Sequence, residues 1–178
     1  MDKSNLIEWA KDILIALIIA IIILFFFKPI IIKQSSMEDT FIENDYVIVS
    51  CQSYRIFSDY KRGDVIVFES ELKADNGKDK NLIKRIIGLP GDTIEIKEGN
   101  VFLNDVMLEE PYLKAQGMSG ELDKITIKDG ELFVMGDNRQ VSLDSRSIGP
   151  IKMDAVMGRV CIRLFPIKKF GTIKRITY

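Results

Sequence analysis

The sequence predicts a mainly β fold, in which an N-terminal transmembrane helix precedes an antiparallel β-sheet domain. Two observations support this prediction. The stretch from Ile13 to Phe27 contains no polar residue, and the chain from Tyr46 onward alternates short β-type runs with turn signals. We therefore divide the 178 residues into a tail with an anchor, residues 1–33, and a β domain, residues 34–178.

The apolar stretch is the first element. A bilayer span needs about 20 residues, so we expect it to extend to Ile32, with Lys28 reaching the interface. A cleaved signal peptide is disfavoured because no small-x-small site follows the stretch. A buried core helix would rarely be apolar on every side in so small a domain. A retained anchor is the favoured interpretation. More basic residues follow the anchor than precede it, which by the positive-inside rule would place the β domain in the cytoplasm. The rule is weak where a long domain follows, because such domains translocate largely regardless of charge, so the orientation stays open.

The β domain consists of short runs bounded by turn residues. We expect strands at residues 45–50, 64–68, 82–88, 92–99, 100–104, 124–130, 131–136, 155–165 and 170–178. The polar segment 70–81 between two of them is expected to be a hairpin loop. This regular spacing favours antiparallel pairing, with helix confined to the anchor and a turn or two.

Composition excludes several functional classes. The chain contains no histidine, which rules out Ser-His-Asp and Cys-His catalysis. Its 25 basic and 26 acidic residues form no basic footprint for nucleic acid. Cys51 and Cys161 alone cannot build a structural zinc site, and they form either one disulfide or two separate thiols.

Four segments interrupt the strand pattern, namely residues 35–40, 62–68, 83–92 and 136–149. The first contains Ser36, which follows Phe27 by at most about 30 Å of extended chain. A reactive Ser36 would therefore lie near the membrane surface. By itself, the segment is more typical of a juxtamembrane linker.

Lys84 lies in a strand pattern where it shares a face with Leu82 and Ile86. An ammonium on an apolar face is unfavourable unless it loses its proton, and a neutral amine is what a lysine base requires. An ordinary lysine is neutral only about 0.4% of the time at pH 8. Using it as a base therefore costs about 3.3 kcal/mol of free energy for deprotonation alone. The alternative is an edge strand with Lys84 in solvent and Arg85 facing inward.

The segment 136–149 concentrates charged and hydroxyl side chains. It is either a solvated loop or an internal frame of ion pairs, in which Asp137 and Asp144 pair with Arg139 and Arg146 and so position Ser142.

Together, the four segments resemble the sequence boxes of the bacterial type I signal peptidases, a Ser-Lys class with an N-terminal anchor. SSMEDT resembles the nucleophile box and RGDVIVF the Gly-Asp strand motif. IKRIIGLPGD resembles the base-lysine box, and GDNRQVSLDSRSIG the last box. The boxes occur in the family's order and spacing, and the compact size is similar to that of Gram-positive relatives.

The resemblance implies roles for individual residues. It assigns Ser36 as nucleophile and Lys84 as general base. It makes Ser142 a hydroxyl that hydrogen-bonds the lysine amine, with Asp144 and Arg146 as a supporting ion pair. Gln34 stands where relatives have Ser or Gly, and its amide could assist or obstruct the oxyanion hole. The implied substrate-binding residues are Ile32, Met37, Phe41 and Ile83.

The implied activity is the cleavage of signal peptides from secreted preproteins with Ala-x-Ala-type sites, without metal or cofactor. The implied location is the cell membrane, as a single-pass protein with its catalytic domain on the extracytoplasmic side. Neither the residues nor the resemblance indicates an oligomeric state. Asp39 replaces the usual Pro and Phe41 the usual Leu, so weak or altered activity is one expectation.

Two other functions are alternatives to this one. A self-cleaving repressor also uses Ser and Lys, but it carries a DNA-binding module where this chain has an apolar span. A non-catalytic signal-peptidase-like membrane chaperone for pilins or other surface proteins is the alternative from a different class. Relatives of that kind tend to lack the serine or the lysine, and both are present here.

Overall fold

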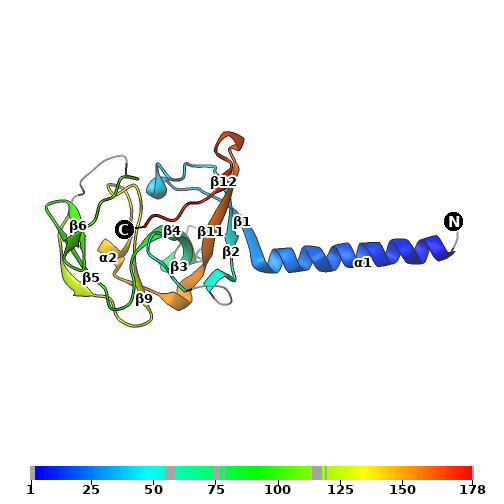
Figure 1. Ribbon diagram of the computed structural model, residues 1–178, viewed down its shortest axis with the longest axis horizontal. Coiled ribbons are helices and arrows are strands. Elements are labelled where there is room, and N and C mark those ends of the chain that lie inside the picture. The colour runs from blue at the N-terminus through cyan, green and yellow to red at the C-terminus, as the bar shows by residue number, and fades with distance from the viewer. Residues whose placement is uncertain are drawn as a thin grey trace.

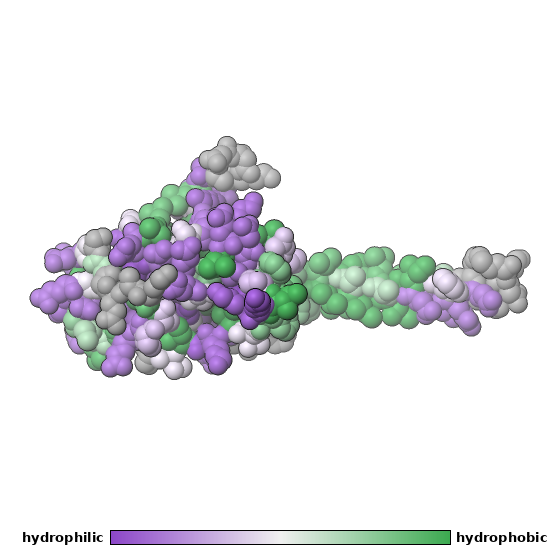
Figure 2. Space-filling model, turned by 90° about the horizontal axis from the view of Figure 1, so that it is seen from above, coloured by the Kyte–Doolittle hydropathy of each residue, from purple (hydrophilic) through white to green (hydrophobic). Residues whose placement is uncertain are grey.

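The computed structural model describes residues 3–54, 59–73, 77, 79–113, 118 and 120–177. One long helix, α1 (Lys3–Phe26), projects away from a β domain that contains nearly all other regular structure (Figure 1). Its segment Ile7–Phe26 is 20 residues long, none of it buried, and is long and apolar enough to cross a membrane. Figure 2 shows this segment as a continuous hydrophobic cylinder with polar residues at its outer end.

Two antiparallel sheets form the domain. The larger has eight strands in the order β1-β2-β11-β3-β4-β9-β10, and β12 pairs with β11. Its strands are β1 (Phe27–Ile31), β2 (Tyr46–Ser50), β3 (Val65–Lys73), β4 (Asp79–Gly88), β9 (Glu131–Met135), β10 (Ile151–Lys152), β11 (Val156–Phe165) and β12 (Gly171–Thr172). The smaller has the order β7-β6-β5-β8, from β5 (Thr93–Lys97), β6 (Asn100–Leu103), β7 (Val106–Met107) and β8 (Leu122–Thr126). The mainly β, antiparallel fold is therefore confirmed.

Short helical turns complete the fold. They are α2 (Ser145–Ile148) and the 3-10 turns η1 (Ser35–Met37), η3 (Met153–Ala155) and η4 (Ile167–Lys169). This agrees with the expectation that helix would be limited to the anchor and a few turns. Both cysteines are free thiols, so of the two predicted states it is the separate thiols that are present.

Strand β4 lies in the middle of the core. It pairs with β3 on one side and β9 on the other. Its apolar side chains enter three different buried clusters: Ile83 the first, Leu82 and Ile86 the second, and Ile87 the third. The third cluster joins the two sheets, because Ile87 and Phe133 of the large sheet pack with Ile94 of the small one. Strand β4 is thus covered on both faces, and this determines the environment of Lys84.

Several predicted boundaries require correction. The helix ends at Phe26, and residues 27–31 form strand β1 instead of extending the span to Ile32. Pro29 explains the change, because proline lacks the N–H that a continuing helix needs and disfavours helix at the residue before it. Strands β3 and β4 form the expected hairpin but extend through Lys73 and from Asp79, so the loop is shorter than segment 70–81. Part of that segment lies outside the described residues.

The C-terminal segment crosses the domain instead of forming a long strand. Within the described part of the predicted strand 170–178, residues 170–177, only Gly171–Thr172 is a strand, and the chain then runs across the face of the domain (Figure 1). Arg175 Nε donates to Asp64 Oδ1 at 2.7 Å. A Cβ at Gly63 would lie 1.8 Å from the carbonyl oxygen of Ile176, so only glycine permits this crossing, and its φ is +81°.

Candidate active site

The structure brings Ser36 and Lys84 together. Ser36 lies on η1, the turn that follows β1, and Lys84 lies on β4. Lys84 Nζ is 2.7 Å from Ser36 Oγ, and it also donates to the carbonyl oxygen of Ile83 at 2.9 Å. Ser36 is 7% exposed and Lys84 is 1% exposed. The contact is therefore a hydrogen bond in a nearly dry environment, between residues 48 positions apart in the chain.

Burial also sets the protonation of Lys84. Desolvation lowers the pKa of this lysine from its ordinary 10.5 to about 8, although the negative charges of Asp144 and Asp137 act in the opposite direction. The positive charges of Lys80 and Arg146 lower the pKa further. A large fraction of the amine is therefore neutral at mildly alkaline pH, which is the state that can accept a proton.

Asn138 holds the Ser36 turn from the opposite side. Its backbone N–H donates to the carbonyl oxygen of Ser36 at 3.0 Å, and its side-chain amide donates to that of Ser35 at 3.2 Å. Gly136 is needed beside it, because a Cβ there would lie 2.4 Å from Ser36 O and 2.2 Å from Ser142 Oγ. Asn138 was not among the predicted site residues, although it lies within the segment 136–149 that the sequence singled out.

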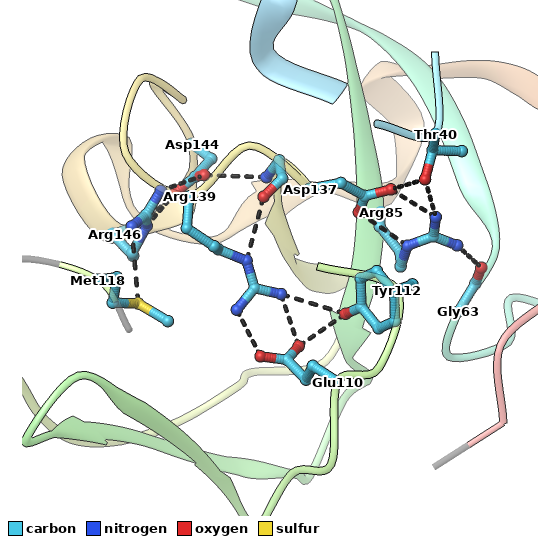
Figure 3. A network of polar contacts seen from close by, with 11 residues as sticks. Thr40, Gly63, Arg85, Glu110, Tyr112, Met118, Asp137, Arg139, Asp144 and Arg146 are labelled. Atoms are coloured by element: carbon cyan, nitrogen blue, oxygen red, sulfur yellow. Dashed lines mark hydrogen bonds and ion pairs between the residues drawn. The ribbon is translucent and has the colours of Figure 1, made fainter. Parts of the chain in front are cut away.

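A buried ion pair connects the serine turn to β4. Arg85 Nε and Nη2 donate to the two carboxylate oxygens of Asp137 at 2.9 and 2.6 Å, and both side chains are at most 1% exposed (Figure 3). Thr40 Oγ1 donates to Asp137 Oδ2 at 2.5 Å and accepts from Arg85 Nη2 at 3.2 Å. Arg85 Nη1 reaches the carbonyl oxygen of Gly63 at 2.8 Å. One guanidinium thus joins three segments around the dyad.

The alternative of an edge strand with Lys84 in solvent is wrong. The two alternatives placed either Lys84 or Arg85 inside, whereas both are buried, one on each face of a central strand. Alternation along one strand decides which residues share a face, but it cannot reveal that both faces are covered.

The ion-pair frame predicted for segment 136–149 is half correct. Asp144 pairs with Arg146 at 2.8 Å, and Asp144 Oδ2 accepts the backbone N–H of Gly136 at 2.9 Å. Burial alone would raise the pKa of Asp144, but the Arg146 guanidinium, together with hydrogen bonds that include the Gly136 N–H, holds the pKa below its ordinary value. Asp137 and Arg139 pair outside the segment instead: Asp137 with Arg85, and Arg139 with Glu110 (Figure 3).

Ser142 lies next to the dyad without bonding to the lysine. Its hydroxyl is buried beside Gly136, and among the described residues it forms no hydrogen bond to the Lys84 amine. The hydrogen bond that the family resemblance implied is therefore not formed. Arg146 Nη2 instead donates to the Ser142 carbonyl oxygen at 3.3 Å, so the ion pair with Asp144 holds the backbone of this residue.

Two adjoining cavities lie at the serine turn, and they share several lining residues. One of about 360 Å³ is lined by both Ser36 and Lys84. The other, a groove of about 340 Å³, is lined by the expected Ile32 and Ile83, and Gln34 lines both. Met37 and Phe41 line neither, because both are fully buried in the core. Phe41 thus packs inward, with the Arg163 guanidinium 4.8 Å from its ring centre, and does not narrow the groove.

A serine hydroxyl hydrogen-bonded to a buried lysine amine in an accessible cavity defines a class of protein: a serine hydrolase in which lysine replaces histidine as the base. The described β domain provides the cavity, and the apolar helix provides an attachment to the membrane.

Comparison with known proteins defines the family. The signal peptidase family, peptidase S26, matches residues 6–165. Signal peptidase I P of Bacillus subtilis subsp. natto is 35% identical over 97% of this chain and 95% of its own length. Signal peptidase IB of Staphylococcus aureus is 33% identical over 94% of each. A solved signal peptidase I from Enterococcus faecalis, 31% identical, covers 57% of this chain and 97% of its own at a TM-score of 0.48.

This chain therefore belongs to the signal peptidase family, peptidase S26. It is a serine peptidase, and together with the apolar helix this membership makes it a membrane-anchored protein. The resemblance in the four sequence boxes is thereby confirmed.

Proposed function

We propose that the protein removes N-terminal signal peptides from secreted preproteins, with Ser36 as the nucleophile and Lys84 as the general base. The observation that carries this assignment is the 2.7 Å contact between Lys84 Nζ and Ser36 Oγ in a buried environment. Both side chains needed for hydrolysis are present, which favours peptidase activity over a non-catalytic chaperone role.

The first half of the reaction forms an acyl-enzyme. Neutral Lys84 Nζ takes the proton of Ser36 Oγ as that oxygen attacks the scissile carbonyl carbon. The resulting oxyanion is stabilised by the backbone N–H of Ser36, with the amide of Gln34 as a second donor. Lys84 then gives its proton to the leaving amine as the C–N bond breaks, which releases the mature protein and leaves the signal peptide esterified to Ser36.

The second half repeats the proton transfers with water. Lys84 Nζ takes a proton from the attacking water, and the new tetrahedral species expels Ser36 Oγ, which recovers its proton from Lys84. The lysine is neutral again at the end of the cycle. Asp144 and Arg146 act indirectly, because they hold the Gly136 and Ser142 backbone next to the serine turn.

The groove beside Ser36 suits an extended substrate with small side chains near the cleaved bond. Ile32 and Ile83 form apolar walls of this groove. We infer that the substrates carry an Ala-x-Ala-type site, because methyl groups fit against such walls without a polar partner. The groove also offers a site for strand addition, in which backbone groups of the substrate supply affinity.

We place the β domain on the extracytoplasmic side of the cell membrane, with α1 as a single span. Signal sequences of exported proteins cross the bilayer, so their cleavage sites emerge on that side. Anchoring the enzyme in the same bilayer raises the effective concentration of enzyme and substrate. Resistance of the β domain to protease added outside spheroplasts would contradict this orientation.

The direct test is cleavage of a preprotein with an Ala-x-Ala site by the full chain in detergent. We expect cleavage after the second alanine by the wild type and none by Ser36→Ala. The matched control is Ser147→Ala, an exposed serine of α2 with no role in the site, which should cleave like the wild type. A folded wild type that cleaves none of several preproteins would favour the chaperone function.

The rate should rise with pH through the titration of Lys84. Only the neutral amine can act as the base, and burial lowers the pKa of this group to about 8. The neutral fraction, and with it kcat/KM, should therefore fall about tenfold per pH unit below pH 7. Above about pH 9 the rate should level off. The measurement is kcat/KM on one peptide from pH 6 to 10, and a profile that stays flat between pH 6 and 9 would exclude Lys84 as the base.

A further inference from the structure

The groove beside Ser36 has an unusual charge distribution. Its walls come from β1, β2, β3, β4 and β11, and its surface is mostly apolar, with Ile30, Val49, Val67 and Met157 among the contributors. Among the residues that the structure describes, the charged ones that line it are Lys28, Lys33 and Lys80, and none is acidic. An apolar groove with lysines alone as its charged residues is suited to an extended, apolar chain that also carries a negative charge.

Two of these lysines lie between the groove and the dyad. Lys33 and Lys80 line both the groove and the cavity that contains Ser36 and Lys84. They come from different parts of the sheet, Lys33 from the segment after β1 and Lys80 from β4. A substrate that occupies both cavities therefore passes the side chains of both lysines, each of which ends in an ammonium group.

These ammonium groups are available to a ligand. Lys33 is exposed and Lys80 half-buried, and neither has an ion-pair partner within the part of the chain that the structure describes. Glu43 lines the dyad cavity but not the groove, so the positive charge of the groove itself is not balanced by its own lining.

The position of the anchor indicates which part of a substrate the groove receives. Lys28 lies two residues after the end of α1, and the groove runs from there to the serine turn. Its end at Lys28 therefore faces the bilayer. The signal sequence of a substrate lies in that bilayer, so the groove receives the segment upstream of the scissile bond. At about 3.3 Å per residue, the chain from Lys28 to Ser36 matches about eight extended substrate residues.

We propose that Lys33 and Lys80 form a specificity determinant, which favours preproteins with an acidic residue upstream of the cleavage site and disfavours those with a basic residue there. This inference rests on the proposed peptidase function. Each ion pair would be partly solvent-exposed and screened by salt, so the preference should be moderate and should decline as ionic strength rises.

The test uses a series of peptides that share one Ala-x-Ala site and differ at one upstream position. Asp, Asn or Lys is placed in turn at the second position and at each of the fourth to eighth positions before the scissile bond, so that both alanines of the site are kept. The full chain is assayed in a zwitterionic detergent at low salt. We expect kcat/KM for Asp to exceed that for Lys by about three- to tenfold at the best position, with Asn between them.

Variants locate the effect on the two lysines. Lys80→Gln and Lys33→Gln should each reduce the Asp-to-Lys ratio, and Lys80→Glu should invert it. Removal of the Lys80 charge also changes the titration of Lys84, which alters the rate for every peptide by the same factor. The Asp-to-Lys ratio of one variant, measured at one pH, is free of this factor. The matched control is Lys152→Glu on β10, an exposed lysine outside both cavities that makes the same change in net charge.

The outcomes separate this inference from the function on which it rests. Equal cleavage of the Asp, Asn and Lys peptides by the wild type would overturn the specificity determinant and leave the peptidase intact. A preference that Lys152→Glu alters as much as Lys80→Glu would also overturn it, since overall charge would then be the cause. No cleavage of any peptide by the folded protein at pH 9 would contradict the peptidase function, and the inference with it.

Discussion

Lys84→Met is expected to abolish cleavage and, at neutral pH, to make the folded protein more stable. Methionine has nearly the length of lysine and no proton-accepting group. Loss of one member of a nucleophile–base pair lowers kcat by about 10⁴-fold or more, and loss of both costs little beyond that. We therefore expect Lys84→Met, Ser36→Ala and the double variant to have similarly low activity.

The stability effect follows from the lowered pKa. Folding lowers the pKa of Lys84 from 10.5 to about 8, so the charged form is disfavoured in the folded state by about 3 kcal/mol. For this basic group the penalty is fully present below pH 8, and it disappears as the pH rises through 10.5, where the unfolded lysine also becomes neutral. Methionine removes the penalty but also the hydrogen bonds to Ser36 and Ile83, each worth about 1 kcal/mol.

The expected net result at pH 6 is a gain of about 1–2 kcal/mol for Lys84→Met, which vanishes or reverses near pH 10. Urea unfolding of wild type and variant in detergent at both pH values measures it. Lys152→Met is the matched control, because this exposed lysine should show no such pH dependence. A variant that is less stable than the wild type at pH 6 would mean that Lys84 is charged and well paired in the folded protein.

The dyad could be predicted because its signal is local. Four short boxes in order pointed to Ser36 and Lys84, and the structure brings these two side chains into contact. The ion-pair partners could not be predicted in the same way. Asp137 and Arg139 are close in sequence, yet Asp137 pairs with Arg85 and Arg139 with Glu110. Such partners depend on which strands the sheet brings together, and no pattern within one segment contains that information.

The boundary of the anchor illustrates a second limit. The apolar stretch continues past the end of the helix to Phe27, the first residue of β1, and resumes at Ile30 after Lys28 and Pro29. A short apolar segment has the same periodicity in a buried strand as in a helix. Pro29 was the signal that could have ended the helix earlier. The five residues from Phe27 to Ile31 instead pair with β2, so the groove beside Ser36 begins immediately after α1.

The second large effect is expected at the ion pair between Arg85 and Asp137. Either Arg85→Met or Asp137→Leu leaves one buried charge without its main partner, and such a loss costs about 3–5 kcal/mol. Since small domains are stable by about 5–15 kcal/mol, each variant should unfold at a much lower urea concentration. Asp137→Asn, which keeps the shape of the side chain, should fall between these variants and the wild type.

The double variant Arg85→Met/Asp137→Leu separates folding from catalysis. Replacing a buried pair by apolar residues of similar size is often nearly neutral for stability, so the double variant should recover most of the loss. Activity should not recover, because Thr40 loses both of its polar contacts in this network and the segment after the serine turn is then held to β4 only through the Lys84–Ser36 contact itself among the side-chain hydrogen bonds described above. Urea midpoints and kcat/KM, measured on the same preparations, would test this. If stability and activity recover together, the pair serves only the fold. If stability alone recovers, the pair also holds Ser36 at the distance from Lys84 at which a proton can be transferred.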